Sequence, residues 1–198
     1  MNNIYNHPMF EKYVSTLKET SCDNRNKKTS NYMTKSTLPA VNFDEVKSEY
    51  IGNLRLTDTP KSNDALFFDK KEVPFFIEFK NGKIERKESY DIKKKIYDSV
   101  LIFTDIVDVG ITELRQNMEY ILVYNKDANS GNVLGEKKES QIQQSSSFNQ
   151  FSKGVTKLAK EEFVEFGLKC FENYCFKKVH TYTIEEFEAF LKNCSQKN

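Results

Sequence analysis

The fold is decided by two neighbouring apolar runs, Asn63-Asp64-Ala65-Leu66-Phe67-Phe68 and Phe75-Phe76-Ile77-Glu78-Phe79-Lys80-Asn81-Gly82. Both runs are rich in the aromatic and aliphatic residues that favour β-strands. An aspartate opens the first run, and a glutamate and a lysine interrupt the second. Side chains alternate between the faces of a strand, so Glu78 and Lys80 are expected on the same face. Charged side chains seldom stay inside an apolar strand unless they are paired, bind a metal or are exposed.

Apolar periodicity on either side of these runs predicts a mixed α/β protein. Asn42 is a suitable N-cap for the helix that precedes them, with Glu45 three residues later, and Gly52 is a suitable stop. In chain order the expected elements are a helix at 42–52, strands at 64–68 and 73–79, a helix at 90–103, a strand at 119–124, a helix at 151–174, a strand at 176–183 and a helix from 183 to about 192. This order predicts a central mixed sheet flanked by helices.

The length and composition of the chain suggest one domain with a polar extension. The chain has 198 residues, of which 38% are hydrophobic and 30% charged. Residues 1–41 are mostly polar and are expected to form an N-terminal extension with at most a short helix at 8–18. Residues 42–198 are expected to form a single domain with a long polar loop at 126–150. The formal net charge of +1 argues against a strongly basic protein that coats nucleic acid.

Nothing in the sequence predicts a secreted, zinc-binding or membrane-spanning protein. The four cysteines form no CxxC pair, and the two histidines complete no zinc pattern. No apolar run approaches the roughly 18 residues of a membrane span, and the N-terminus does not resemble a signal peptide. We therefore expect a cytoplasmic protein with reduced thiols and no membrane partner. The Lys- and Asn-rich composition suggests a low-GC bacterium or its phage.

Asp64, Glu78 and Lys80 together predict a site for a hard divalent cation with a lysine beside it. Mg²⁺ keeps several of its waters, so one or two carboxylates suffice as protein ligands. Asp64 and Glu78, on adjacent strands, would hold the ion, with the backbone carbonyl of Phe79 as a third ligand. The ion would polarise a phosphoryl oxygen and lower the pKa of a bound water. Lys80 would orient or deprotonate that water, or offset charge on the phosphorus.

The structural alternative is that Asp64 is a turn residue and that Glu78 and Lys80 form a surface ion pair on a solvated strand. Three features favour the metal site. The strand that carries Glu78 and Lys80 is otherwise apolar, an aspartate precedes the neighbouring strand, and a lysine-rich amphipathic helix follows.

Asp64, Glu78-Phe79-Lys80 and the helix that follows them resemble the core of the PD-(D/E)XK phosphodiesterase superfamily, which includes restriction endonucleases and repair nucleases. The resemblance covers residues 43–124. It implies an αβββαβ core like that of restriction endonucleases, Asp64 and Glu78 as metal ligands, and Lys80 as the catalytic lysine. Asn63 stands where the family's name residue is proline, which is a departure from the motif.

The resemblance also implies residues from two helices. The first helix of the family often adds a glutamate to the metal site. Glu45 already has a role as a capping residue, so Glu49 is the favoured candidate, with a surface role as the alternative. The second helix often adds a phosphate-facing lysine. At about 100° per residue, Lys93 and Lys95 flank the apolar stripe while Lys94 points to solvent. Lys93 is slightly favoured over Lys95, and a solvated helix face is the alternative for all three.

The resemblance therefore implies a Mg²⁺-dependent nuclease, with Mn²⁺ as a substitute, that hydrolyses DNA rather than RNA by attack of an activated water. The expected partner is nucleic acid, with a homodimer or a protein partner as further options. A role in phage biology, defence or repair fits by analogy alone. The competing hypothesis is a binding module that keeps the nuclease fold without catalysis, such as an immunity, antitoxin or regulatory protein.

Overall fold

The protein forms a six-stranded mixed sheet with the strand order β1-β4-β5-β6-β7-β8. The computed structural model describes residues 7–23, 31–52, 54–130 and 164–195. The strands of this sheet are β1 (Val14–Thr16), β4 (Pro39–Asn42), β5 (Ala65–Phe68), β6 (Pro74–Lys80), β7 (Glu119–Tyr124) and β8 (Lys178–Thr183). Neighbours from β1 to β6 pair antiparallel, and β7 and β8 continue the sheet in parallel. A separate two-stranded sheet joins β2 (Cys22–Asp23) to β3 (Asn31–Tyr32).

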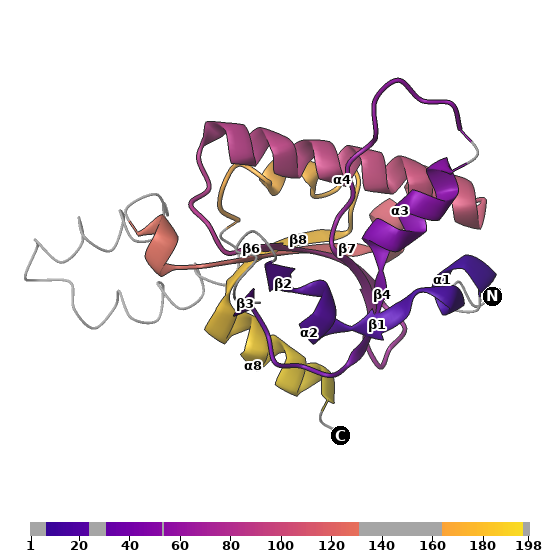
Figure 1. The fold of residues 1–198 in the computed structure, drawn as a ribbon. Coiled ribbons are helices and arrows are strands. Elements are labelled where there is room, and N and C mark those ends of the chain that lie inside the picture. Colours follow the sequence, from indigo (N-terminus) through magenta and orange to yellow (C-terminus); the bar gives the residue numbers. More distant parts are fainter. Residues whose placement is uncertain (1–6, 24–30, 53, 131–163, 196–198) are drawn as a thin grey trace, which may run out of the picture.

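Helices cover both faces of the sheet (Figure 1). They are α1 (Pro8–Lys12), α2 (Leu17–Thr20), α3 (Phe43–Ile51), α4 (Arg86–Val107), α5 (Ile111–Asn117) and α8 (Ile184–Ser195), with short 3₁₀ turns η2 (Asp127–Asn129) and η3 (Lys169–Phe171). The long helix α4 crosses one face between the parallel strands β6 and β7, as a parallel connection requires. The helix α8 lies on the opposite face (Figure 1).

Alternation along the strands divides the interior into two apolar clusters, one on each face of the sheet. On the α4 face, Phe76 packs against Phe43 of α3 and Phe103 of α4, with ring centroids 4.8 and 5.7 Å apart. On the α8 face, Phe79 packs against Phe187 at 5.6 Å. Because Phe76 and Glu78 are two residues apart, the carboxylate of Glu78 lies on the α4 face beside this cluster.

The prediction of an α/β protein with a central mixed sheet flanked by helices is confirmed. The expected helices at 42–52 and 90–103 appear as α3 and α4, and the expected strands at 64–68, 73–79 and 119–124 as β5, β6 and β7. The N-cap of α3 is the predicted one, because the Asn42 side chain accepts a hydrogen bond from the backbone N–H of Glu45 at 3.3 Å. The expected strand and helix near the C-terminus appear as β8 and α8.

The expected boundary between a polar extension at 1–41 and a domain at 42–198 is wrong, because it cuts through β4. Residues 14–16 and 39–42 supply two strands of the main sheet. The expected helix at 8–18 ends at Lys12, and β1 follows. Phe10 packs into the cluster on the α4 face and Leu17 into the cluster on the α8 face, so one helix could not bury both. The apolar residues of this polar segment are too widely spaced to predict the strands β1 and β4 from the sequence.

The predicted polar loop at 126–150 lies mostly outside the described residues, apart from η2 and the residues up to 130. Residues 151–163 of the predicted helix at 151–174 also lie outside the described residues. Its remaining part, residues 164–174, is not an α-helix. Phe166 and Gly167 there adopt positive φ angles of 58° and 68°, which break a right-handed helix.

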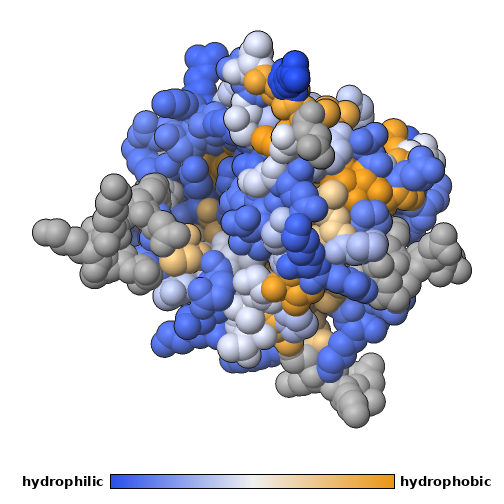
Figure 2. Space-filling view, turned by 45° about the vertical axis from the view of Figure 1, so that its right-hand side comes forward, coloured by the Kyte–Doolittle hydropathy of each residue, from blue (hydrophilic) through white to orange (hydrophobic). Residues whose placement is uncertain are grey.

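The surface seen in Figure 2 is mostly hydrophilic, with apolar colour confined to separate patches. The exposed aliphatic side chains among the described residues include Val14, Leu54, Leu101 and Ile111, and single exposed apolar residues are common on protein surfaces. Among the described residues, no helix has both the length and the apolar character to cross a membrane.

We expect Phe76→Ala to lower the free energy of unfolding by about 3–5 kcal/mol, because it empties a fully buried aromatic site between the sheet and two helices. Urea denaturation followed by circular dichroism measures the loss. Leu101→Ala is the control, since Leu101 is 67% exposed on α4, and it should cost less than about 1 kcal/mol. A loss for Phe76→Ala as small as that of the control would contradict the packing described above.

Candidate functional site

Asp64, the residue just before β5, lies beside Glu78 of the neighbouring strand β6. Ala65 pairs with Ile77 in the antiparallel ladder, so Asp64 falls opposite Glu78 one step further along. The backbone N–H of Phe79 donates to Asp64 Oδ2 at 2.7 Å, which holds the carboxylate toward β6. The Glu78 side chain is 1% exposed and that of Asp64 is 17% exposed. The structure thus brings together the two carboxylates that the sequence singled out.

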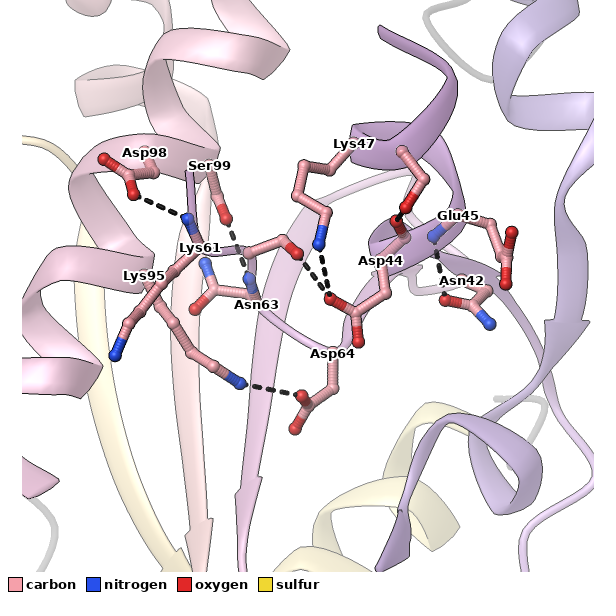
Figure 3. A network of polar contacts seen from close by, with 12 residues as sticks. Asn42, Asp44, Glu45, Lys47, Lys61, Asn63, Asp64, Lys95, Asp98 and Ser99 are labelled. Atoms are coloured by element: carbon pink, nitrogen blue, oxygen red, sulfur yellow. Dashed lines mark hydrogen bonds and ion pairs between the residues drawn. The ribbon is translucent and has the colours of Figure 1, made fainter. Parts of the chain in front are cut away.

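Lys95 of α4 links the two carboxylates. Its Nζ lies 3.0 Å from Asp64 Oδ1 and 2.7 and 2.8 Å from the two oxygens of Glu78. Figure 3 shows Lys95 reaching from α4 to Asp64. One ammonium therefore contacts three carboxylate oxygens, and the three protons of the ammonium match them in number.

Burial and mutual repulsion shape the charges of this cluster. Burial, followed by the charge of Asp64, raises the pKa of Glu78 to about 8. Burial also raises the pKa of Asp64, while the charge of Lys95 limits the rise. For Lys95, burial acts to lower the pKa, but the charges of Glu78 and Asp64 outweigh it, so the pKa is raised and the ammonium stays charged. A site that holds two carboxylates against one ammonium has room for more positive charge.

Lys80 and the backbone of Phe79 border the same site. Lys80 follows Glu78 by two residues on β6 and lines the same cavity. Within the described parts of the chain, Lys80 forms no ion pair shorter than 4.0 Å. The N–H and C=O of one strand residue point to the same side, so the carbonyl of Phe79 faces the Asp64 side of β6. Both groups are therefore placed to act on a ligand that contacts the two carboxylates.

The site opens into a cavity of about 290 Å³. Its lining comes from β6, α4 and the residue before β5, and also from residues 19–23, Met33, Asn42 and Asp44. The walls carry more acidic than basic residues: the acids are Glu19, Asp23, Asp44, Asp64 and Glu78, and the bases are Lys80 and Lys95. A cavity with this surplus attracts cations and repels anions unless a cation is present.

Asp44 is a residue of this cavity that sequence reasoning missed. It lies in the first turn of α3, accepts a hydrogen bond from Ser62 and is 3.7 Å from Lys47 Nζ. Its charge adds to the rise in the pKa of Asp64. The sequence showed only an acidic residue next to an N-cap, where acids are common for helix-dipole reasons, so it gave no signal of the cavity.

Glu49 and Lys93 lie away from the site. Glu49 accepts hydrogen bonds from Lys12 and Tyr13, and it does not line the cavity. Tyr50, the next residue of α3, donates to Asp105 at 2.7 Å, while Glu49, about 100° away around the helix, meets Lys12 of α1 and Tyr13. The Nζ of Lys93 lies near Gly167, in the segment before η3. The lysine on α4 that meets the carboxylates is therefore Lys95 and not the slightly favoured Lys93.

Asn63 fixes the start of β5 under α4. Its backbone N–H donates to Ser99 Oγ at 2.8 Å, and both residues are buried. Ser99 follows Lys95 by one helical turn, so the same face of α4 holds Asn63 and Asp64 (Figure 3). The side-chain amide of Asn63 and the Tyr120 hydroxyl are buried and have no hydrogen-bond partner within the described structure. A proline at position 63 would lack the N–H that Ser99 accepts.

Comparison of the chain with models of protein families finds no match, and comparisons with curated proteins and with solved structures find none either. The functional interpretation therefore rests on the fold and on the geometry of this site.

The residues present fit a Mg²⁺ ion that keeps several waters. Among the described residues, no three His, Cys, Asp or Glu side chains form a metal-binding group. Two carboxylates and one backbone carbonyl meet the lower limit for protein ligands of Mg²⁺. The buried carboxylate pair, with only one ammonium between the two, supplies the negative charge that such an ion needs. Asp64, Glu78 and the Phe79 carbonyl are thus the candidate ligands.

We expect wild-type protein to lose stability as the pH rises from 5 to 8, and Glu78→Gln to lose less. The pKa of Glu78 is about 8 in the folded protein and about 4.3 in an unfolded chain. Between these values the folded state retains a proton that the unfolded state has released, so its stabilisation is complete below the lower pKa and lost as the pH passes the upper one.

Urea denaturation at pH 5 and pH 8 tests this expectation. The pH-dependent loss should be larger in wild type than in Glu78→Gln by on the order of 1–4 kcal/mol. Glu85→Gln removes a fully exposed carboxylate and should behave as wild type. Equal losses in wild type and Glu78→Gln would show that Glu78 titrates normally.

Proposed function

We propose that this protein is a metal-dependent nuclease of the PD-(D/E)XK type, which uses Mg²⁺ or Mn²⁺ to hydrolyse phosphodiester bonds in nucleic acid, DNA rather than RNA. The observation that carries the proposal is the convergence of Asp64, Glu78 and Lys80 from adjacent strands on one cavity. The ordinary surface explanation does not apply to Glu78, because its side chain is 1% exposed.

Each residue has a role that its position permits. Asp64 and Glu78 would hold the ion together with the Phe79 carbonyl. A bound Mg²⁺ supplies Lewis-acid stabilisation of the phosphate and a water of lowered pKa. Lys80, on the same strand face as Glu78, would orient the attacking water and offset negative charge on the phosphoryl oxygens. Water attack at phosphorus forms one P–O bond as the bond to the leaving sugar oxygen breaks.

The order of elements supports the proposal in part. A helix, two strands, a helix and a further strand follow one another as α3, β5, β6, α4 and β7. The resemblance implies three strands between the two helices. Here the third antiparallel neighbour, β4, precedes α3 in the chain and pairs with β5. The connectivity of the core thus departs from the implied αβββαβ order, while the strands that carry the site keep their arrangement.

The charge of the cavity supports a role for a cation. Five acidic and two basic residues line it, so a phosphodiester would be repelled by the protein alone. A divalent ion between Asp64 and Glu78 would cancel the charge of these two carboxylates and lower the acidic surplus of the lining from three to one, which favours entry of a phosphate next to Lys80.

A second candidate is favoured by one observation, the contact of Lys95 with both carboxylates. A protein that needs no metal could keep Asp64 and Glu78 as a buried ion-pair network, and the fold would then serve as a binding module. A regulatory, immunity or antitoxin protein would fit that description. Removing one member of such a network destabilises a protein strongly even where it has no catalytic role.

We expect the wild-type protein to cut supercoiled plasmid, single-stranded DNA or RNA in the presence of Mg²⁺ or Mn²⁺, and to be inactive in EDTA. Lys80→Met and Asp64→Asn should lower the cleavage rate by at least about 10²-fold, since each removes a group that acts on the reacting phosphate or on the ion. Agarose-gel assays on all three substrates measure the rate and name the substrate class.

Glu49→Gln is the matched control, because it removes a carboxylate that does not line the cavity. This variant should retain activity. Circular dichroism establishes that each variant is folded. Cleavage that persists in Asp64→Asn would rule out this site. A wild-type protein that binds neither metal nor nucleic acid would favour the binding module instead.

A further inference from the structure

Every carboxylate oxygen of the candidate metal site already has a donor. Asp64 Oδ2 accepts the N–H of Phe79 at 2.7 Å. Asp64 Oδ1 and both oxygens of Glu78 accept from the ammonium of Lys95 at 2.7 to 3.0 Å. A carboxylate oxygen has two lone pairs, so these contacts do not saturate the oxygens, but they place the ammonium between the two carboxylates, where a bridging ion would lie.

A divalent cation and the Lys95 ammonium therefore compete for the same place. Both are cations, so they repel each other at short range, and repulsion inside a buried site is screened little. The Lys95 ammonium contacts Oδ1 of Asp64 and both oxygens of Glu78, so a cation that bridges the two carboxylates through these atoms would lie next to it. The two occupants exclude each other.

Lys95 has space to leave. Its side chain is 24% exposed, and the residue lines the cavity. A lysine has a flexible four-carbon stem, so its ammonium can move into the cavity by rotation about side-chain bonds without unwinding α4. The next turn of α4 stays fixed to the start of β5, because Ser99 Oγ accepts a hydrogen bond from the backbone N–H of Asn63.

We infer that Lys95 is an internal cation that occupies the metal position of the metal-free protein, and that a divalent ion binds to Asp64 and Glu78 only by displacing it. This inference rests on the proposed function for its metal site. It assigns Lys95 a positioning role in that site, and it predicts that the lysine weakens metal binding while it stabilises the metal-free fold.

The displaced ammonium would then lie in the cavity beside Lys80. Five acidic and two basic residues line the cavity, so a bound divalent ion would lower its acidic surplus from three charges to one. The site would accordingly accept a phosphodiester more readily after the exchange, because the lining repels a phosphate less.

The experiment is a measurement of Mn²⁺ affinity by isothermal titration calorimetry on the full chain, at one pH and ionic strength. The proteins compared are wild type, Lys95→Met, Lys95→Arg and Lys80→Met. We expect Lys95→Met to bind Mn²⁺ at least about tenfold more tightly than wild type, since no occupant has to be displaced. Lys95→Arg, which keeps the charge and the donors, should bind no more tightly than wild type.

Lys80→Met is the matched control, because it removes the same charge from the same cavity without vacating the metal position. It should raise the affinity by a clearly smaller factor than Lys95→Met does, because Lys80 does not occupy the position between the two carboxylates. A gain in Lys80→Met equal to that in Lys95→Met would mean that general electrostatics explains the effect, and the inference would be overturned.

Thermal denaturation with and without Mn²⁺ gives a second readout that does not depend on activity. Lys95→Met should melt at a lower temperature than wild type without metal, since two buried carboxylates lose their counter-ion, and should gain more from Mn²⁺. If Lys95→Met does not fold without metal, folding induced by Mn²⁺ supports the inference, and Lys95→Gln replaces it in the titration.

The outcomes separate this inference from the proposed function. If wild type binds Mn²⁺ and neither Lys95→Met nor Lys95→Gln binds it more tightly, the metal site stands and the displacement is wrong. If no protein in the series binds Mn²⁺, the metal site itself is wrong, and the inference falls with it.

Discussion

The burial of the Glu78 carboxylate is the constraint on which the arrangement of α4 depends. A carboxyl group with 1% exposure needs polar partners, since a buried polar group left unpaired is costly. Lys95 supplies these contacts at 2.7 and 2.8 Å, so α4 has to present this residue to the sheet. The same rotation points Ile92, Ile96 and Phe103 into the apolar cluster and directs Ser99 to the backbone of Asn63. One polar requirement thus fixes the rotation of a 22-residue helix.

The elements that could be predicted from sequence are those with a long, regular apolar pattern. The helix α4 and the strands β6 and β7 have such patterns, and Asn42 gave α3 a recognisable start. The strands β1 and β4 could not be predicted, because their sequences VST and PAVN hold few large apolar residues, whereas the equally short β5 reads ALFF. Short strands carry little signal of their own, and pairing alone decides them.

The candidate site was predictable where it depends on alternation along one strand, and unpredictable where it depends on packing between elements. Glu78 and Lys80 share a face because they are two residues apart. Whether Lys93 or Lys95 meets the sheet depends on the rotation of α4, and helical spacing alone places both beside the apolar stripe. The position of Glu49 likewise depends on contacts between elements. Its hydrogen-bond donors, Lys12 and Tyr13, lie 37 and 36 residues earlier in the chain.

The contribution of residues before 42 to the main sheet has a consequence for how the protein avoids association with other chains. Strand β4 pairs with β5 at Val41 and Asn42 and shields an apolar strand, and β1 in turn covers β4. A chain shortened to begin at residue 42 would leave the backbone donors and acceptors of β5 without neighbours on that side. Uncovered edges of this kind are templates for intermolecular β-pairing. The N-terminal segment therefore moves the edge of the sheet from the apolar strand β5 to the three-residue strand β1, and short edge strands are poorer templates for such pairing, while its residues 19–23 line the cavity.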